Sequence, residues 1–479
     1  MIQTNNYIDG HWVGGDSTIA NINPSDTRDT IGEYAQASVV QVEEAIAGAK
    51  RAQKEWATTG LEQRYNVLMS IGNALMSRSA ELGELLCREE GKTRPEGKGE
   101  VYRAGQFFTY YAAEVLRQMG EICDSVRPGV EVQVTREPVG VVGMVTPWNF
   151  PTALPSWKIA PALAYGNGIV WKPASLTPAS AVALMEIIAE QDLPPGLVNM
   201  VLGAGSKVGE AIIGSADVDA ITFTGSVATG KRIASAAAAN LTKVQMEMGS
   251  KNPLVILEDG DMETAVACAI NGAFGSTGQK CTASSRIIVA EKIHDQFVDA
   301  MQAAMHNLVV GHALDEKTNI GPAVDGGQLE QNQRYMKIAA EEGAERVCGG
   351  ELLELETPGH YMQPALFINT SNDMRINKDE VFGPMTCVIK VADYDEALAV
   401  ANDTQFGLTS SVITESLAKA NHFKKHAKTG CVMVNLPTSG TDYHVPFGGR
   451  KSSSFGSREQ GTYAAEFYTH VKTTYLKSE

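Results

Sequence analysis

The sequence of 479 residues lacks the features that mark several large classes of protein. It has seven cysteines, an odd number, and none is spaced as CxxC, which argues against a disulfide framework and against a zinc site. No apolar run approaches the roughly 20 residues of a membrane helix. The first residues, MIQTNNYIDGHWV, carry neither the basic nor the apolar region of a signal peptide. We therefore expect no metal, no membrane partner and a cytoplasmic location.

The chain also has fewer basic than acidic residues. The chain has 40 Lys and Arg against 56 Asp and Glu, a formal net charge of −16, so neither nucleic acid nor an anionic membrane is expected as a partner. A local cationic pocket inside such a protein still permits an anionic small-molecule substrate. The helically spaced pair His422 and His426 has no third ligand nearby and is typical of a solvated helix face.

What the sequence does contain is a regular alternation of strands and helices. Apolar residues at helical spacing predict amphipathic helices over 39–51 and 61–88. From Pro155 onward, short apolar strands alternate with helices, which predicts parallel βαβ units in a doubly wound sheet. A second series of the same kind runs over 252–394, after a predicted junction at 248–253.

The end of the chain, residues 463–479, alternates bulky and polar residues as a strand does. An exposed edge strand rich in β-branched and aromatic residues is a liability that a partner usually covers. The tail is therefore a sign of a homo-oligomer.

A single cysteine stands in an unusual setting in STGQKCTASSR, residues 276–286. Cys281 is surrounded by small polar residues and has Lys280 beside it, which is typical of a reactive thiol rather than a structural one.

Two glycine-containing turns follow predicted strands and open helices. Gly225 and Ser226 belong to one, and Gly205 and Gly209 belong to the other. The first amides of a helix bind phosphate, and glycine lets the phosphate approach, although a plain tight turn has the same pattern. At another strand end, in WKPAS, Lys172 is placed to meet a ribose hydroxyl or a phosphate; an ordinary surface lysine before a proline turn is the alternative.

Two further polar residues lie where chemistry needs them. Asn149, in TPWNFP, is held between aromatics and prolines and is either an oxyanion donor or a turn residue. Glu247, in QMEMG, follows an apolar strand and is either a general base or a carboxylate paired with Lys251. Together with Cys281 and the glycine turns, they are the parts of an acyl-enzyme mechanism coupled to hydride transfer.

Over essentially its whole length the chain resembles the NAD(P)-dependent aldehyde dehydrogenases. The stretches that carry the resemblance are TPWNFP (146–151), WKPAS (171–175), FTGS (223–226), MEMGSKNP (246–253), GQKCTASSR (278–286), EVFGPM (380–385) and PFGGRKSS (446–453). The resemblance implies an α/β fold of two doubly wound domains with a small β oligomerisation element, assembled as a homodimer or homotetramer. The implied parts are a dinucleotide-binding domain (1–119 and 137–249), a catalytic domain (250–438), and oligomerisation strands with a C-terminal segment (120–136 and 439–479).

The resemblance also implies roles for individual residues. Cys281 is the nucleophile, its backbone N–H and the Asn149 amide hold the oxyanion, and Glu247 activates water to release the acid, with Lys251 as its supporting neighbour. Lys172 belongs to both the catalytic and the cofactor-binding sets. The implied cofactor-binding residues are Thr146, Trp148, Lys172, Ala174, Ser175, Gly205, Gly209, Phe223, Gly225, Ser226, Thr229, Met248, Glu380 and Phe382.

One departure from the family pattern bears on the cofactor. Many NAD-preferring members have a glutamate three residues after the lysine, where this chain has Ser175. Serine removes the charge that would repel a 2′-phosphate and leaves Lys172 free to pair with that phosphate. The expected cofactor is NADP, with NAD also accepted.

The substrate expectation rests on resemblance alone. The stretches FPTALPSWKIAPALAYGN and TDYHVPFGGRKSSSFGSREQG are similar to those of enzymes that oxidise α-ketoglutaric semialdehyde to 2-oxoglutarate through a thiohemiacetal and a thioester. Succinic semialdehyde is an alternative, although many enzymes for it carry an arginine where this chain has Trp157.

Four side chains are expected to line the substrate site. Arg103 and Lys280 are candidate partners for an anionic group; a surface ion pair is the alternative for Arg103, and lowering of the thiol pKa is the alternative for Lys280. Trp157 and Phe447 would form an apolar tunnel, which also suits a betaine-type or aromatic aldehyde.

Overall fold

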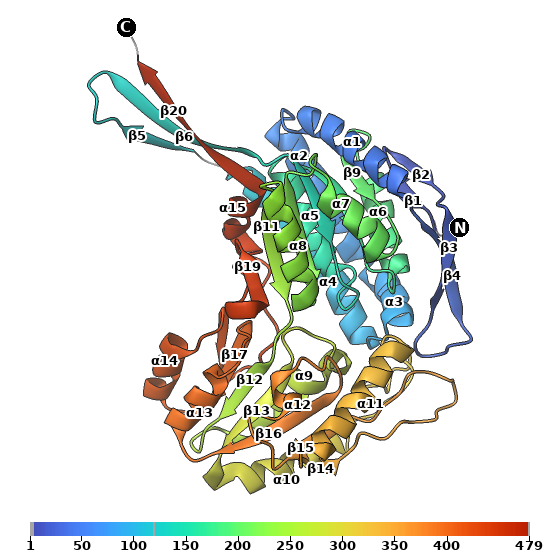
Figure 1. Ribbon diagram of the computed structural model, residues 1–479, viewed down its shortest axis with the longest axis vertical. Helices are drawn as coiled ribbons and strands as arrows, with labels where there is room; N and C mark the ends of the chain where they lie inside the picture. Colours follow the sequence, from blue (N-terminus) through green and yellow to red (C-terminus); the bar gives the residue numbers. More distant parts are fainter. Residues whose placement is uncertain (1–3, 118–119, 478–479) are drawn as a thin grey trace.

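The computed structural model describes residues 4–117 and 120–477. Two β-sheets lie one above the other, each flanked by helices, and a three-stranded arm projects from the upper part (Figure 1). The predicted boundary at 119 and the ends of the chain, 1–3 and 478–479, lie outside the described residues.

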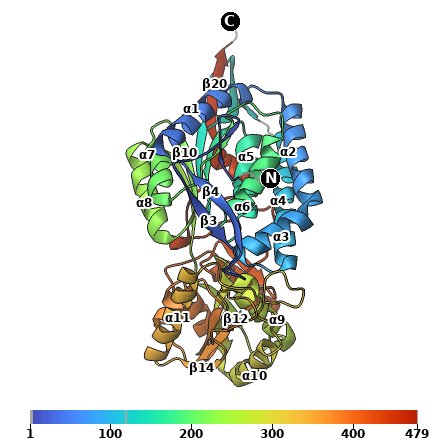
Figure 2. The ribbon, with the colours of Figure 1, turned by 90° about the vertical axis from the view of Figure 1, so that its right-hand side faces the viewer.

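The N-terminal segment forms long helices on both faces of the first sheet: the first of them lies on one face and the other three lie on the opposite face (Figure 2). They are α1 (Val39–Trp56), α2 (Leu61–Ser77), α3 (Ser79–Glu90) and α4 (Arg94–Val115). The predicted helix over 61–88 is therefore two helices that meet at Arg78. α2 and α4 pack closely because glycines face each other, and a Cβ on Gly72 would lie 2.8 Å from the carbonyl oxygen of Gly105.

The first sheet has eight strands in the order β19-β11-β10-β7-β8-β9-β1-β2. Their bounds are β1 (Asn6–Ile8), β2 (His11–Val13), β7 (Val141–Val145), β8 (Gly168–Lys172), β9 (Val198–Met200), β10 (Ala220–Gly225), β11 (Lys243–Met248) and β19 (Ser454–Gly456). The five strands from β11 to β9 are parallel, as the sequence predicts. The chain order reverses between β7 and β10, and ligands of such sheets bind at the carboxyl ends of the strands beside this point.

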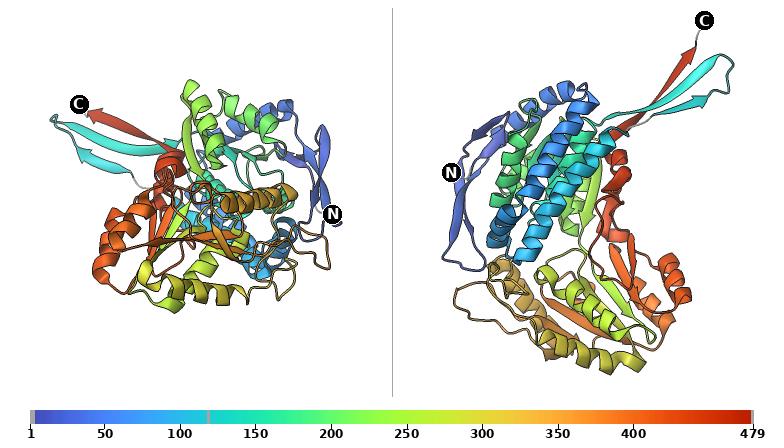
Figure 3. Two further views of the ribbon diagram at one scale, coloured as in Figure 1. Left: turned by 60° about the horizontal axis from the view of Figure 1, so that its bottom comes forward. Right: turned by 180° about the vertical axis from the view of Figure 1, so that it is seen from behind.

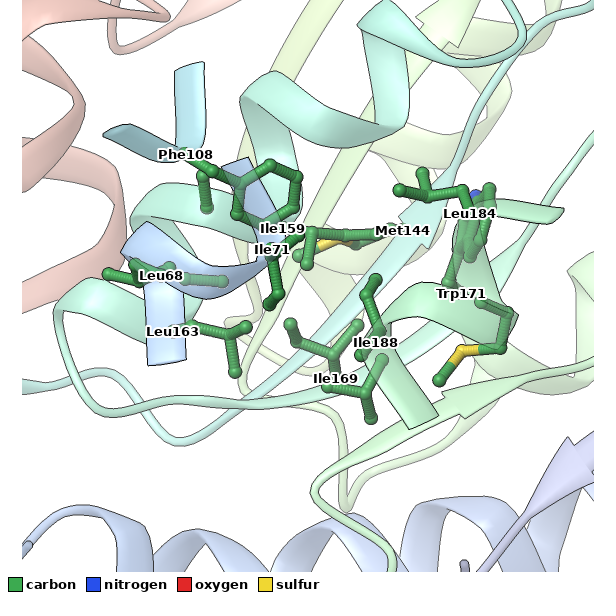
Figure 4. Close-up of a cluster of buried hydrophobic side chains, with 14 of the residues drawn as sticks. Leu68, Ile71, Phe108, Met144, Ile159, Leu163, Ile169, Trp171, Leu184 and Ile188 are labelled. Atoms are coloured by element: carbon green, nitrogen blue, oxygen red, sulfur yellow. The ribbon is translucent and has the colours of Figure 1, made fainter. Parts of the chain in front are cut away.

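The helices that connect these strands bury the core of the first sheet. They are α5 (Ala153–Ala164), α6 (Pro178–Ala189), the π-turn η1 (Gly205–Gly209) with α7 (Glu210–Gly214), and α8 (Val227–Ala239). Figure 4 shows side chains of α2, α4, α5 and α6 meeting β7 and β8, with Ile169 and Trp171 fully buried. This packing fixes where β7 and β8 end, and both ends carry predicted site residues.

The second sheet follows the first with a linker of only three residues, 249–251. Its order is β14-β15-β16-β13-β12-β17-β18, and every pairing except β14 with β15 is parallel. The strands are β12 (Asn252–Ile256), β13 (Ser284–Ala290), β14 (Glu345–Cys348), β15 (Ala365–Ile368), β16 (Met385–Val391), β17 (Thr409–Ile413) and β18 (Cys431–Val434). The helices are α9 (Met262–Phe274), η2 (Gly275–Gly278), η3 (Glu291–Ile293), α10 (His294–Met305), α11 (Gly326–Glu341), α12 (Arg375–Lys378), α13 (Tyr394–Asn402) and α14 (Leu417–His426).

The arm is an antiparallel sheet in the order β20-β6-β5 that extends away from both larger sheets (Figure 3). Its strands are β5 (Glu121–Asp124), β6 (Val130–Pro138) and β20 (Thr469–Lys477). The strand predicted for the tail is correct only from Thr469, because η5 (Gly461–Ala464) and α15 (Ala465–Tyr468) precede it. Phe467 and Tyr468 are both buried, as neighbouring residues of a packed helix are and alternating residues of a half-exposed strand are not.

A separate hairpin of β3 (Ser17–Ile22) and β4 (Thr30–Gln36) lies along the side of the molecule between the levels of the two sheets (Figure 2). Within residues 4–117 and 120–477, no helix is long and apolar enough to cross a bilayer. Within those same ranges, no group of three or more His, Cys, Asp or Glu side chains is placed to hold a metal ion.

Candidate active site

A cavity of about 510 Å³ brings together residues from both sheets. It lies where the carboxyl ends of β7, β10 and β11 face the loop before β13. Of the residues singled out from the sequence, it is lined by Arg103, Trp148, Asn149, Trp157, Gly225, Ser226, Met248, Lys280, Cys281, Glu380, Phe382 and Phe447. The sequence prediction that these distant segments share one site agrees with this arrangement.

The turn before the nucleophile is strained. Ser276, Thr277 and Gly278 all have positive φ, at 51°, 57° and 69°. Such conformations are costly for non-glycine residues and persist only where surrounding contacts hold them. Here the Glu96 carboxylate accepts a hydrogen bond from the Ser276 N–H at 2.6 Å, and the Thr277 hydroxyl donates to a carbonyl oxygen of the next loop at 3.0 Å.

Asn252, the first residue of β12, holds the other side of this loop. Its Nδ2 donates to the carbonyl oxygens of Cys281 at 2.7 Å and Ala283 at 2.9 Å. Its Oδ1 accepts from the Ser250 hydroxyl at 2.7 Å and the Thr409 N–H at 3.0 Å. The linker between the two sheets is thereby tied directly to the nucleophile.

The pKa of the Cys281 thiol is raised overall, so Lys280, whose alternative role was to lower it, does not set the pKa of this thiol. Burial raises the pKa of Cys281, and the negative charges of Glu380 and Glu247 raise it further. The Lys280 ammonium donates to the Asn271 carbonyl oxygen at 3.1 Å, in α9, and burial lowers its own pKa to about 8. Lys280 and Cys281 do interact through their charges, but burial and the two carboxylates have larger effects on the pKa of the thiol.

Asn149 follows β7 and is buried at 4% exposure. Its Nδ2 donates to the Gln279 carbonyl oxygen at 3.0 Å, two residues before Cys281, which leaves the second N–H of the same amide for a ligand. The Lys92 ammonium donates to the backbone carbonyl oxygen of Asn149. The Glu100 carboxylate accepts from the N–H groups of Thr152 and Ala153 at the start of α5. The amide is thus held in place before any substrate arrives.

Glu247 lies at the end of β11 and is also buried. One oxygen accepts from the Ser454 hydroxyl at 2.6 Å, and the other has no hydrogen-bond partner in the described part of the chain. Burial raises the pKa of Glu247 well above its usual value, and the nearby Glu459 carboxylate adds to this shift. Lys251 is not its partner, in contrast to the sequence expectation, since Lys251 lies near Cys387 and Arg286 on the side of the second sheet.

Lys158, on α5, is the cation that most lowers the pKa of Glu247. Its ammonium is fully buried and contacts the Glu459 carboxylate and, at 2.8 Å, the Thr222 hydroxyl. Sequence analysis did not select Lys158 or Glu459. The signal was available, because Lys158 is the only charged residue in the apolar run 153–164.

The predicted adenosine-side residues lie along one edge of the first sheet. Lys172 ends β8, and its ammonium donates to the Pro173 carbonyl oxygen at 2.6 Å. Its aliphatic chain runs under the η1 turn, where a Cβ on Gly209 would lie 3.7 Å from Lys172 Cδ. Burial lowers the pKa of Lys172 to about 8. Ser175 is partly exposed, and its hydroxyl donates to the Gly203 carbonyl oxygen at 3.2 Å.

The remaining residues of this edge divide into two kinds. Thr146 and Phe223 are buried and support the edge: the Thr146 hydroxyl accepts from the Trp171 indole N–H at 2.9 Å. Ala174 and Gly205 are accessible from the surface side of the same edge.

The β10–α8 turn has the form of a phosphate cradle. Ser226 caps α8 and accepts from the Thr229 N–H at 3.3 Å. A Cβ on Gly225 would lie 2.5 Å from the Phe223 ring, so no larger residue fits there without displacing that ring. Exposed helix N–H groups beside a residue that must be glycine fit a pyrophosphate group.

The opposite wall of this edge comes from the second sheet. Glu380 is partly accessible, accepts from the Ser250 N–H at 2.9 Å, and has its pKa raised to about 7 by burial. A Cβ on Gly249 would lie 2.1 Å from a Glu380 oxygen. Phe382, at φ 62°, packs edge-to-face on Trp148 with ring centroids 5.5 Å apart. Together, the cradle and this carboxylate fit a dinucleotide that spans from Lys172 to Cys281.

The wall of the cavity around Arg103 is largely aromatic. Trp157 packs on Phe447 with centroids 5.5 Å apart and on Phe107 at 5.7 Å. The Arg103 guanidinium lies 5.3 Å from the centroid of the Tyr443 ring. Arg103 makes no ion pair with any carboxylate of the described residues, so the surface ion pair considered for it is not formed there.

Comparison with known proteins gives matches over the whole chain. The model of the aldehyde dehydrogenase family matches residues 12–474. The α-ketoglutaric semialdehyde dehydrogenase of Bacillus subtilis is 40% identical over 476 residues, which is 98% of each chain. The α-ketoglutarate semialdehyde dehydrogenase of Haloferax volcanii is also 40% identical, over 475 residues and 98% of each chain.

A solved structure agrees equally well. The betaine aldehyde dehydrogenase of Staphylococcus aureus in complex with NAD+ superposes with a TM-score of 0.97 at 34% identity, covering 99% of this chain and 95% of that chain. The α/β class and the family resemblance inferred from the motifs are confirmed. With a match from residue 12 to residue 474, the chain belongs to the aldehyde dehydrogenase family.

Proposed function

We propose that the protein oxidises an aldehyde to a carboxylic acid on Cys281, and that its substrate is α-ketoglutaric semialdehyde, also named 2,5-dioxopentanoate. Cys281 loses its proton to water, and the resulting thiolate attacks the aldehyde carbon to form a thiohemiacetal. The oxygen that becomes negative is met by the free N–H of the Asn149 amide and by the backbone N–H of Cys281. Loss of hydride from the same carbon leaves a thioester on the sulfur.

The dinucleotide would be held by Lys172 and Ser175 at the ribose, by Gly225 and Ser226 at the pyrophosphate, and by Glu380 at the nicotinamide ribose. When bound, the nicotinamide ring supplies the acceptor for that hydride. The glycines at 225 and 249 support this assignment, because a Cβ at Gly225 would displace the Phe223 ring beside the turn and a Cβ at Gly249 would displace the Glu380 carboxylate.

Glu247 completes the reaction by accepting a proton from water, which then attacks the thioester and releases the acid and the thiol. Its unpartnered oxygen supports this role because it is free to accept a proton, and its raised pKa makes the carboxylate a stronger base than an exposed glutamate. The buried pair of Lys158 and Glu459 acts on the proton affinity of Glu247 in opposite directions, because Lys158 lowers the pKa of Glu247 and Glu459 raises it.

The observation that carries the substrate proposal is the Arg103 guanidinium. It lines the cavity, stacks on Tyr443, and pairs with no carboxylate of the described residues. A cation in an aromatic wall attracts the carboxylate of a semialdehyde acid and repels a cationic aldehyde. The name carried by the Bacillus and Haloferax relatives supports the same substrate.

A second candidate is a betaine-type aldehyde. The wall of Phe107, Trp157 and Phe447 has the aromatic faces that bind a quaternary ammonium group. The positive charge of Arg103 in the same cavity makes this the weaker proposal.

For the cofactor, we propose that NADP is used well and that NAD is also accepted. Ser175 places no negative charge beside Lys172, so a 2′-phosphate meets a cation and a hydroxyl at this edge. Oligomers, dimeric or tetrameric, form through the arm, where Val471, Tyr475 and Leu476 are exposed at 59%, 60% and 58%. All seven cysteines are free, which supports a reducing, cytoplasmic location.

The test is steady-state kinetics with NADP and NAD on three aldehydes: 2,5-dioxopentanoate, succinic semialdehyde and betaine aldehyde. We expect 2,5-dioxopentanoate to have the highest kcat/KM, with no activity in Cys281→Ala. Arg103→Met keeps most of the side-chain length. It should lower kcat/KM for 2,5-dioxopentanoate and succinic semialdehyde by about 10- to 100-fold, and leave kcat/KM for betaine aldehyde unchanged or higher. A higher kcat/KM for betaine aldehyde in the wild type would favour the second candidate, and rejection of NADP would overturn the cofactor proposal.

A further inference from the structure

Gln460 has an unusual environment beside the reacting groups. Its side chain is 1% exposed, yet it lines the cavity that contains Cys281. Neither Nε2 nor Oε1 has a hydrogen-bond partner among residues 4–117 and 120–477. A buried amide with both ends unpaired is disfavoured unless a bound molecule meets it, so its position in the cavity points to a ligand.

The backbone of Gln460 is strained as well. Its φ of 63° and ψ of 169° lie in a region that glycine occupies and other residues rarely do. Both neighbours hold it there: Glu459 exchanges two backbone hydrogen bonds with Phe447, at 2.7 and 2.9 Å, and the Gly461 carbonyl oxygen accepts from the Tyr111 hydroxyl at 3.1 Å. Strain that the surroundings enforce is common where a side chain must point into a functional site.

The charges around Gln460 decide which part of a substrate it can meet. Glu459, the preceding residue, is a buried carboxylate, so a second carboxylate from a substrate is unfavourable there. A neutral carbonyl oxygen carries no such penalty and accepts a hydrogen bond from an amide N–H. The substrate carboxylate would instead meet Arg103, which lines the same cavity.

We propose that Gln460 recognises the 2-oxo group of a 2-oxo acid semialdehyde, with its Nε2 donating to the 2-oxo oxygen. This inference rests on the proposed function and adds a residue that determines its specificity. A site that must hydrogen-bond one substrate group rejects the analogue that lacks the group, because the protein's own polar atoms then stay unpaired. Gln460 would therefore separate 2,5-dioxopentanoate from 5-oxopentanoate, which has the same length and charge but no 2-oxo group.

The experiment compares kcat/KM for these two aldehydes in the wild type and in Gln460→Met, which is close to isosteric but has no amide. We expect the wild type to prefer 2,5-dioxopentanoate by about 10- to 100-fold, and the variant to reduce this ratio to about 3 or less by losing activity on the 2-oxo compound alone. Gln460→Leu is the second apolar variant if the first does not fold.

Gln328→Met is the matched control. Gln328 lines the same cavity, but its Nε2 already donates to Asn332 Oδ1 and to the Phe382 carbonyl oxygen, both at 3.0 Å. Its substitution should leave the ratio of the two aldehydes as in the wild type. A binding readout is provided by calorimetry on Cys281→Ala, where 2-oxoglutarate should bind more tightly than glutarate, and the added Gln460→Met should remove the difference.

The outcomes separate this inference from the proposed function. If the wild type prefers betaine aldehyde over both acids, the proposed function is wrong and Gln460 has no 2-oxo group to recognise. If the wild type prefers 2,5-dioxopentanoate but Gln460→Met lowers kcat/KM for both aldehydes equally, the proposed function stands and the proposed role of Gln460 is wrong.

Discussion

At the scale of single residues, burial controls the Cys281 thiol more strongly than the adjacent lysine does. Lys280 is next to Cys281 in the chain, but its ammonium donates to the Asn271 carbonyl oxygen in α9. Adjacent residues in an extended chain direct their side chains to different sides, so the charge next in sequence need not have the largest effect on the pKa of a group. The thiol is thus expected to be protonated in the resting enzyme at neutral pH.

This state predicts the pH dependence of alkylation. Because the thiolate reacts and the pKa of Cys281 is raised, inactivation by iodoacetamide should be slower at pH 7 than the reaction of a free thiol, by about tenfold for each unit of pKa increase. The rate constant should rise through pH 9 without a plateau. Mass spectrometry should assign the modification to Cys281, with Cys281→Ala as the control for the exposed Cys123. A rate that is already fast and constant at pH 6–8 would contradict the raised pKa.

At the scale of elements, the three-residue linker between β11 and β12 joins the base, the nucleophile loop and the cofactor edge. Glu247 precedes the linker, Asn252 follows it, and Glu380 packs on Gly249 within it. A change in this linker should therefore affect ligand binding more than folding.

We expect Gly249→Ala to weaken cofactor binding while the protein remains folded. The new methyl group would meet the end of the flexible Glu380 side chain, at 2.1 Å in the present position, so Glu380 must move and the backbone need not. The dissociation constant for NADP or NAD, measured by quenching of protein fluorescence, should rise by about 10-fold, the value expected for loss of one hydrogen bond to a charged group.

Glu380→Ala is the matched comparison, and the melting temperature reports on folding. An equal rise of the cofactor dissociation constant in the two variants would support the displacement of Glu380. Unchanged binding in Gly249→Ala would show that the carboxylate does not hold the ribose.

The sequence predicted the parallel βαβ units well because their apolar strands and intervening helices have distinct periods. It gave no element over 94–115, where α4 forms, since this segment begins RPEGKGE and has three glycines. Glycine lowers helix propensity, but here Gly97 and Gly105 allow close packing on Cys87 and Met76. Tertiary packing supplies the stability that the local sequence lacks.

The candidate site was predictable in part for a similar reason. Asn149 and Glu247 are single polar side chains among apolar residues near strand ends, and Cys281 is a thiol among small polar residues, which a sequence pattern can identify. Lys92 acts through a neighbour that is distant in the chain, and no local pattern reveals that its ammonium meets the backbone carbonyl oxygen of Asn149. The direction of the Lys280 side chain was unpredictable on the same grounds.

At the scale of the whole molecule, the arm exposes apolar side chains that we expect another chain to cover. β20 is the edge strand, and every residue of it after Thr469 is exposed. Its strand partner β6 leaves only one residue buried, Val132. An apolar, extended sheet with so little core is stable chiefly when another chain covers it.

We expect Val471→Asp to reduce the oligomeric state without unfolding the chain. Val471 pairs across the strands with Arg136, so the new carboxylate gains a favourable neighbour within the arm while the exposed apolar contact is lost. Val40→Asp in α1 is the control, because Val40 is exposed to a similar degree, 60% against 59%. Light scattering after gel filtration measures the mass, and an unchanged mass for Val471→Asp would argue against association through this face.

The arm also sets an order of events during synthesis. Arg136 in β6 and Thr469 in β20 are hydrogen-bonded partners separated by 333 positions along the chain. At roughly 5–20 residues per second, a ribosome needs on the order of 15–70 s to make that interval. During this time β6 has no β20 to pair with, and Glu247 lacks its hydrogen-bond donor Ser454. A nascent chain therefore stays catalytically incomplete and unassembled until residues 454–477 have been made.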